Sequence, residues 1–198
     1  MLIDYGRDRL LSTFGIQTLE DRYLIEGESS PQDAFARAAK AFADDESHAQ
    51  RLYDYASNLW FMFSTPILSN GGTTRGLPIS CFLNHVEDSR EGLTGHYTEN
   101  AYLSSVGGGI GGNWGAVRSV GSRTSSGSES TGVIPFLKVV DAEMLAFSQG
   151  VTRRGSYAAY LHISHPEIQE FLDVRKPTGG DINRKSTNLH HAVVIPDK

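Results

Sequence analysis

The first third of the chain carries apolar residues at the spacing of amphipathic helices. Ser30 followed by Pro31 is a typical helix start, because a serine side chain caps open amide groups and proline fits the first turn. Apolar residues then recur every three or four positions. A second helix is predicted from about Glu46, with its apolar side continuing to Phe63. We therefore expect a helical region over residues 1–63.

The rest of the chain alternates between short apolar runs and longer helical patterns. The predicted elements are, in chain order, a polar loop at 64–80, strands at 81–86, 113–120, 157–163 and 192–195, and helices at 91–106, 133–147 and from about 168. A capping-box pattern over 164–167 precedes the last helix, and the serine-rich segment 121–132 is expected to be a mobile loop. Strands separated by helices are typical of a parallel sheet, so residues 64–198 are expected to form an α/β domain.

Composition narrows the class of protein. Hydrophobic residues make up 39% of the chain and charged residues 21%, which is ordinary for a soluble globular protein. The net charge of −5 argues against a broad nucleic-acid-binding surface. No apolar run approaches the roughly 20 residues of a membrane span, and the first residues lack the apolar core of a secretory leader. A single cysteine forms no internal disulfide and favours the cytoplasm.

Glycines cluster at Gly107–Gly112 and include the spacing G-x-G-x-x-G. A dinucleotide-binding fold needs a strand before this motif and a helix after it. Here a predicted helix precedes the cluster and a strand follows, which excludes that fold. Two interpretations remain, a backbone cradle whose N–H groups meet a substrate and a tight turn that needs positive φ.

Several polar residues have both a structural and a functional interpretation. Asp88 and Ser89 stand at a predicted helix start, where capping explains them and contact with a ribose or base edge is the alternative. Arg118 alone is typical of a solvated surface charge. Arg153 and Arg154 lie in a glycine-flanked loop, and paired guanidinium groups there suit phosphate or base contacts.

Cys81, the only cysteine, is by default a small buried hydrophobe. Its place near two loops suited to phosphate points instead to thiol chemistry on a nucleotide. A nucleophile formed with His85 or His96 is a further alternative, but the surrounding sequence supplies no oxyanion or orienting signature. Two histidine pairs, at 162/165 and 190/191, lack the spacing of a metal site, and no metal is predicted.

Together these segments resemble the large (α) subunit of class I ribonucleotide reductase. The matching stretches are STPILSNGGT at 64–73, Ser80-Cys81, the turn Gly107–Gly112, RSVGS at 118–122, SQG at 148–150 and YLH at 160–162. The resemblance runs from about Thr13 to the last residue. The combination and order of the stretches are specific, although no single one is.

The resemblance implies an activity and a fold. Members of the family reduce ribonucleotides to deoxyribonucleotides for DNA synthesis by radical chemistry at the ribose 2′-hydroxyl. A dithiol of the thioredoxin or glutaredoxin type donates the electrons and becomes the disulfide, which is the acceptor when the reaction is written in reverse. Their fold is a ten-stranded α/β barrel made of two parallel halves. This chain would supply the N-terminal helical region, residues 1–63, and the first strands and helices of a partial barrel, residues 64–198.

The resemblance also assigns roles to residues. Cys81 would be one of two reducing thiols that become a disulfide during turnover. The proposed substrate contacts are Thr65, Ser80, Gly108 and Gly109. The proposed contacts of a deoxynucleotide effector are Asp88, Ser89 and Arg118. Residues 119–131 would form a first specificity loop, and a second loop over 149–155 would include Gln149, Arg153 and Arg154. The helix at 88–106 would lie in the interface of a homodimer.

The same resemblance implies the partners and the missing parts. No cofactor would be bound directly by this segment, and a radical cofactor would reside in a partner small subunit, with ATP or a deoxynucleotide as effector. No nucleic acid or membrane is expected as a partner. The second reducing cysteine, the thiyl-radical cysteine and the glutamate base of the family are absent, so a C-terminal segment of the large subunit would be required. No ATP-cone region precedes the resembling stretch, so we expect no switch of that kind.

Two other functions fit the same residues. The first is a non-catalytic nucleotide-binding regulatory module that keeps only the effector site. The second is a fragment of a cobalamin-dependent reductase, since that class shares the barrel.

Overall fold

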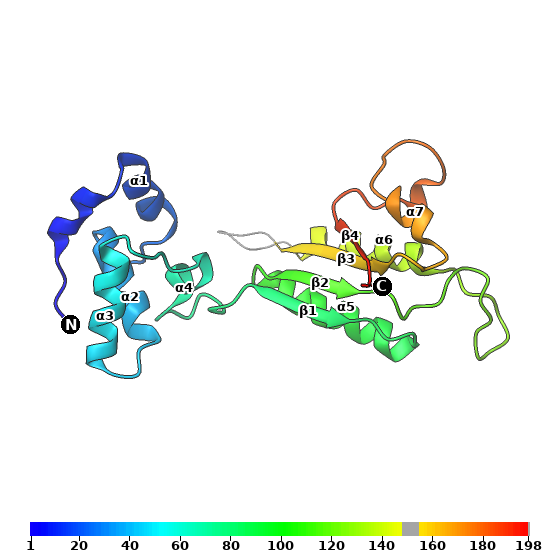
Figure 1. Cartoon of the computed structure of the whole chain (residues 1–198), viewed down its shortest axis with the longest axis horizontal. Helices are drawn as coiled ribbons and strands as arrows, with labels where there is room; N and C mark the ends of the chain where they lie inside the picture. The colour runs from blue at the N-terminus through cyan, green and yellow to red at the C-terminus, as the bar shows by residue number, and fades with distance from the viewer. Residues whose placement is uncertain (148–154, 198) are drawn as a thin grey trace. The chain divides into compact units, whose positions relative to one another are not determined.

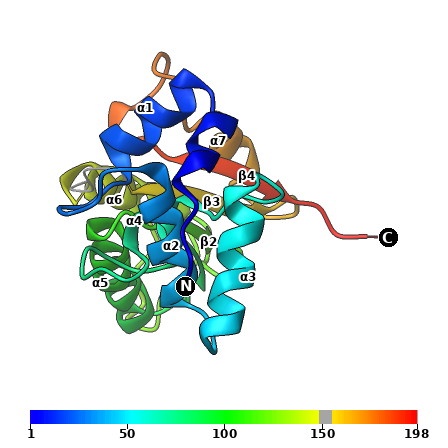
Figure 2. The same ribbon diagram turned by 90° about the vertical axis from the view of Figure 1, so that its left-hand side faces the viewer.

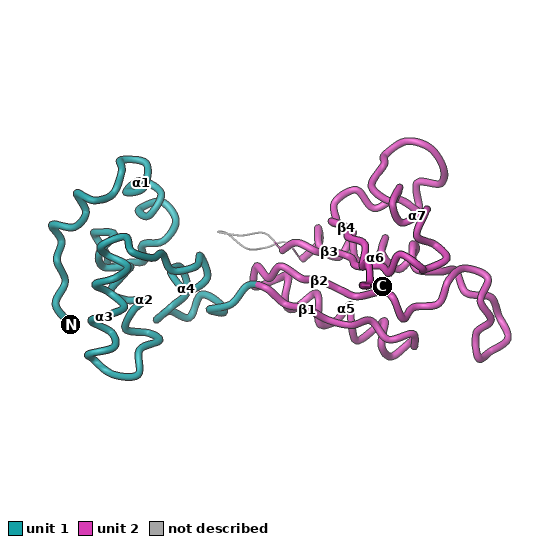
Figure 3. The backbone as a smooth tube through the Cα atoms, in the orientation of Figure 1, with its two compact units in different colours: residues 1–80 teal, residues 81–198 magenta. Residues whose placement is uncertain are grey.

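The structure is a computed structural model that describes residues 1–147 and 155–197. It divides into two compact units, Met1–Ser80 and Cys81–Lys198 (Figure 3). The sequence placed the boundary after residue 63. The later division follows from helix α4 (Thr65–Asn70), which packs on α2 (Pro31–Ala41) within the first unit.

The first unit is helical (Figure 1). Its elements are a 3₁₀ helix at Tyr5–Leu10 and the helices α1 at Thr13–Arg22, α2 at Pro31–Ala41, α3 at Glu46–Ser57 and α4 at Thr65–Asn70. The predicted start of α2 is confirmed, because the Ser30 side chain accepts from the Gln32 amide and Asp33 completes a capping box. Phe35 and Tyr53 are fully buried in the core of this unit.

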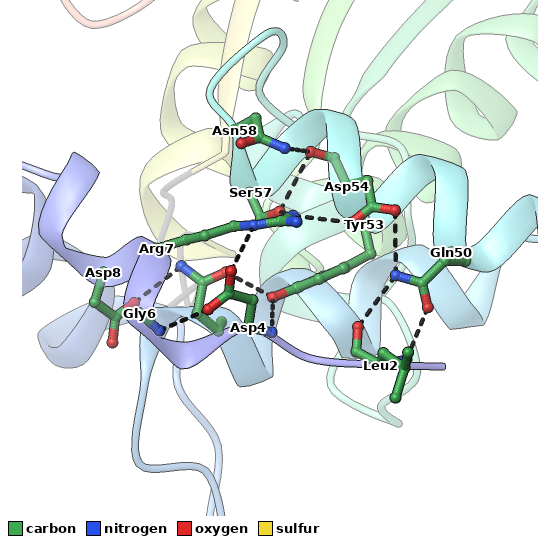
Figure 4. A network of polar contacts seen from close by, with 11 residues as sticks. Leu2, Asp4, Gly6, Arg7, Asp8, Gln50, Tyr53, Asp54, Ser57 and Asn58 are labelled. Carbon is green, nitrogen blue, oxygen red and sulfur yellow. Dashed lines mark hydrogen bonds and ion pairs between the residues drawn. The ribbon is translucent and has the colours of Figure 1, made fainter.

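Polar contacts tie the N-terminal residues to α3 (Figure 4). The Leu2 amide donates to the Gln50 side chain at 2.7 Å, and the Asp4 amide donates to the Tyr53 hydroxyl at 2.8 Å. Arg7 forms an ion pair with Asp54 at 2.9 Å. The unit is therefore closed by hydrogen bonds between residues almost 50 positions apart in the sequence.

Two predictions for this unit are wrong. Helix α3 ends at Ser57, so the apolar run continuing to Phe63 is not its buried side. Leu59 adopts a left-handed φ of 61°, which ends the helix, and the side chain of Trp60 is 72% exposed. The polar stretch 64–80 is not all loop, because α4 occupies its start. Arg37 on α2 donates to the Leu68 carbonyl of this helix at 3.1 Å.

The second unit is built on a four-stranded parallel sheet in the order β1-β2-β3-β4. The strands are β1 at Cys81–His85, β2 at Gly109–Asn113, β3 at Ser156–His162 and β4 at His190–Val194. The connecting helices are α5 at Arg90–Ser105, α6 at Val133–Ala146 and α7 at Ile168–Leu172, followed by a 3₁₀ helix at Ile182–Arg184. The predicted α/β class and the strand–helix–strand order are confirmed.

The helices of this unit cover one face of the sheet. Figures 1 and 2 show α5 and α6 along the same side of the strands, and their side chains meet those of the sheet in one core. Trp114, Leu137 and Tyr157 are among its fully buried residues. On the opposite face the Leu83 side chain is 85% exposed. Successive strand residues face opposite sides, so Cys81, Leu83 and His85 share this exposed face.

Strand β2 is displaced from its predicted position at 113–120. It consists of the glycine cluster itself, which residue propensities do not favour as a strand. Packing explains the glycines: a Cβ on Gly112 would lie 1.7 Å from the Tyr157 hydroxyl, and one on Gly111 would lie 2.8 Å from the Leu83 side chain. Bulky neighbours on both faces therefore occupy the space above and below this strand.

The capping box predicted over 164–167 is also absent. Ser164 contacts the His162 ring at 2.6 Å, and α7 starts at Ile168 with no side-chain cap. The Glu167 carboxylate instead accepts hydrogen bonds from the amides of Val120 and Val133. Across the part of the chain that the structure describes, no helix has the length and apolar character needed to cross a bilayer.

Candidate functional site

The parallel register brings the predicted substrate residues of the second unit to one edge of the sheet. Cys81, the first residue of β1, is aligned with Gly109, the first residue of β2. Cys81 is exposed, so the interpretation as a buried hydrophobe is wrong. An exposed thiol at a strand end is accessible to a second thiol or to a bound ligand. Ser80 immediately precedes it, and Thr65 lies in the first unit as the opening residue of α4.

The turn before β2 supports the structural interpretation of part of the glycine cluster. Gly107 has φ of 80°, and its amide donates to the Ser104 carbonyl at 3.0 Å. The Gly108 amide donates to the Leu103 carbonyl at 2.8 Å. Both N–H groups therefore satisfy the end of α5, as in helix-terminating glycine motifs. A Cβ on Gly108 would lie 2.6 Å from the Leu103 oxygen, which leaves no room for a side chain.

The predicted effector residues gather at the opposite edge of the same sheet. Asp88 follows β1 and Arg118 follows β2, and the Arg118 Nε donates to the Asp88 carboxylate at 2.7 Å. Both side chains are about one-third exposed, at 30% and 33%. Arg118 is thus one member of a defined pair, not an isolated surface charge. A partly exposed guanidinium group in a fixed position is suited to bind phosphate.

Ser89 caps helix α5, as the structural interpretation predicted. Its hydroxyl accepts a hydrogen bond from the Gly92 amide at 2.9 Å. The cap, Asp88 and Arg118 therefore lie together at the start of a 16-residue helix. The positive end of such a helix favours anions, which adds to the charge of the arginine.

Residues 119–131 form a hairpin closed by backbone hydrogen bonds. The Thr124 amide donates to the Ser128 carbonyl at 2.8 Å, and the Ser130 amide donates to the Ser122 carbonyl at 2.8 Å. At its base, Arg118 donates to the Arg123 carbonyl at 3.0 Å. The predicted first specificity loop thus contacts the predicted effector arginine directly. The residues of the second loop, Gln149, Arg153 and Arg154, lie outside the described residues.

The two histidines considered as partners of Cys81, His85 and His96, lie on different faces of the sheet. His96 lies on α5 and is 4% exposed, and its Nε2 is 3.0 Å from the Tyr157 hydroxyl beneath the covered face of the sheet. Burial lowers the pKa of His96 to about 4. It does not share the exposed face of Cys81, whereas His85 does. Within residues 1–147 and 155–197, no three metal-binding side chains gather into a possible metal site.

No sequence pattern predicts Glu167 and His165 as residues of this region. Glu167 is 5% exposed, and its carboxylate accepts from the amides of Val120 and Val133 at either end of the hairpin segment. Its local pattern matched a helix cap, which concealed the long-range contact. A glutamate followed by an apolar helix carries no mark of a partner more than 30 residues earlier.

Two family models match the chain. The all-alpha domain of ribonucleotide reductase matches residues 9–76, and the barrel domain matches residues 79–198. The chain belongs to the ribonucleotide reductase large-subunit family. The family fold predicted from the sequence motifs is confirmed.

Relatives match nearly the whole chain. It is 50% identical over 196 residues to the ribonucleoside-diphosphate reductase large subunit of Invertebrate iridescent virus 3, covering 98% of this chain and 30% of that protein. It is 36% identical to the ribonucleoside-diphosphate reductase subunit alpha of Helicobacter pylori strain 26695, covering 96% of this chain and 25% of that protein. The chain therefore spans about a quarter to a third of these relatives.

A solved structure gives the same assignment. The Actinobacillus ureae class Id ribonucleotide reductase alpha subunit matches with a TM-score of 0.75 and 28% sequence identity. The match covers 98% of this chain and 34% of that one. The helical unit and the parallel sheet thus both occur in a ribonucleotide reductase large subunit.

Proposed function

We propose that this chain is the N-terminal part of a ribonucleoside-diphosphate reductase large subunit, with Cys81 as a reducing thiol. The observation that carries the proposal is the position of Cys81, exposed at the first residue of β1 in a sheet of this family. The rest of the barrel and a radical-generating small subunit would complete the enzyme. No described residue is assigned to the radical cofactor, which the small subunit would hold.

The proposed reaction needs a second thiol. Replacing the ribose hydroxyl by hydrogen takes two electrons: the carbon–oxygen bond breaks, a carbon–hydrogen bond forms and water leaves. Two thiols supply the electrons and hydrogens and become one disulfide. Because Cys81 is the only cysteine here, the second sulfur must come from the C-terminal part of the large subunit, within about 7 Å between Cα atoms.

Reconstitution tests the catalytic proposal. The chain is combined with a polypeptide covering the C-terminal part of a related large subunit and with the small subunit, and deoxyribonucleotide formation is measured. Activity is expected to be lost in Cys81→Ser and retained in His85→Ala. Equal loss in both variants would favour the Cys–His nucleophile, and activity of Cys81→Ser would contradict the proposed thiol. A requirement for adenosylcobalamin in place of the small subunit would indicate the cobalamin-dependent class.

We also propose that Asp88, Ser89 and Arg118 bind a deoxynucleoside triphosphate effector. The ion pair, the helix start and the hairpin all belong to the second unit. Their position within one unit also suits the second candidate function, a regulatory module that binds nucleotide without chemistry. Binding of dTTP in the absence of activity in every reconstituted mixture would select it.

A homodimer through α5 is part of the same proposal. Tyr102 on this helix is 73% exposed, so its ring is available for contact with a second subunit. Tyr102→Glu is expected to shift the sedimentation of the reconstituted large subunit from dimer to monomer. Unchanged sedimentation would contradict the assignment of this helix to the interface.

A further inference from the structure

The segment between β3 and α7 contacts both ends of the connection that joins β2 to α6. His165 Nε2 lies 2.9 Å from the Val117 carbonyl oxygen. The Glu167 carboxylate accepts from the Val120 amide at 3.1 Å and from the Val133 amide at 3.0 Å. Residues 165–167, here called the anchoring segment, therefore bind the connection on both sides of Arg118 and at its far end. In Figure 1 this connection lies beyond the arrowheads of the strands.

Glu167 is a buried carboxylate whose partners explain its burial. Only 4% of its side chain is exposed, and Arg184 approaches its other oxygen at 3.4 Å. Arg184 also forms an ion pair with Glu170, so Glu170 helps to hold this cation beside Glu167. A buried carboxylate is costly unless charge and hydrogen bonds compensate it. Here two amides and one guanidinium group do so.

Glu167 contacts the backbone at the start of helix α6. Val133 is the first residue of α6, so the carboxylate occupies the position of a helix cap and the favourable end of the helix dipole. Gly132 precedes it with φ of 82°, and a Cβ there would lie 2.3 Å from the carboxylate. A larger residue at 132 would displace Glu167. The position of the Glu167 carboxylate therefore depends on the absence of a side chain at Gly132.

Both ring nitrogens of His165 have hydrogen-bond partners in the backbone. The Glu167 amide donates to His165 Nδ1 at 3.2 Å, so Nδ1 is an acceptor. The carbonyl of Val117 can only accept, so Nε2 must carry the hydrogen. These two partners are matched by the tautomer that carries its hydrogen on Nε2. Through Nε2 the ring joins the anchoring segment to Val117, four residues after the end of β2.

Arg118 lies between two backbone groups that these contacts fix. Val117 is held through its carbonyl and Val120 through its amide. From this position Arg118 reaches Asp88 and the Arg123 carbonyl. A guanidinium group held in its binding geometry loses less conformational entropy when a phosphate binds. Glu167 and His165 therefore act on Arg118 through the backbone groups of Val117 and Val120.

We propose that Glu167 and His165 are positioning residues for Arg118 and thereby raise the affinity of its site for a deoxynucleoside triphosphate. The part concerning affinity rests on the proposed effector function of Asp88, Ser89 and Arg118. The part concerning Arg118 geometry does not. Hydrogen exchange and NMR test the geometry of Arg118, and the Kd for dTTP tests the affinity.

The test compares Glu167→Gln with Glu170→Gln in the full chain. Both variants remove one carboxylate near Arg184, but only Glu167 touches Val120 and Val133. In Glu167→Gln, amide hydrogen exchange at Val120 and Val133 is expected to accelerate about tenfold, since a charge-assisted hydrogen bond is lost. The Arg118 Nε–H signal in nitrogen-15 NMR is expected to shift, and the Kd for dTTP to rise about tenfold. Glu170→Gln is expected to leave all three close to wild type.

A second pair of variants guards against general unfolding. His165→Gln retains an amide nitrogen that can donate to the Val117 carbonyl, whereas His165→Leu does not. The Arg118 signal and the dTTP affinity are expected to be preserved in the first and altered in the second, with slow exchange retained at the β3 amides in both. Unchanged Arg118 signals in Glu167→Gln and His165→Leu, or equal changes in the Glu170→Gln control, would overturn the proposal. If the wild-type chain binds no dTTP, the effector function and the affinity claim are both wrong, and the Arg118 signal alone decides the geometry.

Discussion

The hydroxyl group of Tyr157 on β3 lies 3.0 Å from Nε2 of His96 on α5, in the core between sheet and helix. The same hydroxyl accepts a hydrogen bond from the Trp114 indole at 2.8 Å. The Tyr157 hydrogen is then available to His96 Nε2, which also lies 2.9 Å from the Asn100 side-chain amide nitrogen. One tyrosine oxygen thus contacts a nitrogen of two buried rings from different parts of the unit.

Removal of this hydroxyl is expected to destabilise the protein. Tyr157→Phe leaves the Trp114 N–H and the His96 ring nitrogen buried with one partner fewer, which costs about 1–3 kcal/mol of unfolding free energy. Urea unfolding measures the loss. The control is Tyr160→Phe on the same strand, whose side chain lies on the exposed face of the sheet. Equal stability of the two variants would contradict the role of the network.

Glu143 gives a prediction about pH. Burial raises its pKa to about 7 from an ordinary value of 4.5, so the folded protein holds a proton that the unfolded chain releases. The contribution of Glu143 to stability is therefore full below pH 4.5 and is lost as pH rises to about 7. Glu143→Gln is expected to be more stable than wild type at pH 8, by about 1–2 kcal/mol after allowance for partial solvent exposure. The exposed Glu129→Gln is the control, and equal effects in chemical unfolding at pH 5 and pH 8 would refute the assignment.

His96 changes the pH dependence of stability in the opposite direction to Glu143. Its pKa is lowered to about 4, so the unfolded chain binds a proton between pH 4 and 6.5 that the folded protein excludes. Stability from His96 is present above pH 6.5 and is lost as pH falls towards 4. The two buried groups partly cancel in the wild-type protein. The slope revealed by Glu143→Gln should accordingly be a rise in stability with pH over this range.

Two glycines are expected to respond to alanine in opposite directions. Gly112→Ala places a Cβ 1.7 Å from the Tyr157 hydroxyl and is expected to destabilise the protein by about 3 kcal/mol or to prevent folding. Gly95 lies within α5 with no neighbour within 4 Å of an added Cβ. Gly95→Ala is expected to stabilise the protein by about 0.5–1 kcal/mol. Thermal unfolding of both variants tests the pair, and a stable Gly112→Ala protein would show that β2 packs differently.

The proposed effector site makes a matched prediction for two arginines. Arg118→Ala is expected to weaken dTTP binding about tenfold or more, because it removes the group assigned to the phosphate. Arg123 contributes only its carbonyl to the contact with Arg118, so Arg123→Ala should bind dTTP nearly as wild type does. Calorimetric titration of both variants measures this difference. In the reconstituted enzyme, equal losses of effector and substrate affinity in Arg118→Ala would remove the assignment.

Local patterns predicted much of the fold and failed where distant residues decide the structure. Strands β1 and β3 and helices α2, α5 and α6 were predicted to within a few residues from apolar spacing and helix caps. Strand β2 was misplaced because its glycines are required by the side chains of Tyr157 and Leu83, which are distant from β2 in the sequence. The end of α3 at Ser57 was missed because the apolar residues after it resemble a continuing helix.

The candidate site shows the same division. Cys81, Asp88 and Arg118 were identified through the family resemblance, but their arrangement depends on strand register. The register puts Cys81 and Asp88 at opposite edges of one sheet and brings Arg118 to Asp88. Glu167 was assigned to its own helix because a capping pattern is local, whereas its partners Val120 and Val133 precede it by 47 and 34 residues. Such partners are visible only in three dimensions.

The cap of α6 has a consequence for biosynthesis. The helix begins at Val133, but the carboxylate that completes its first turn is translated 34 residues later. Until that residue leaves the ribosome, the first turn of α6 and the hairpin before it lack their shared partner. A nascent chain arrested before Glu167 is therefore expected to be cleaved by protease near residue 132, and a chain from which Glu167 and Arg184 have both left the ribosome is expected to resist cleavage there.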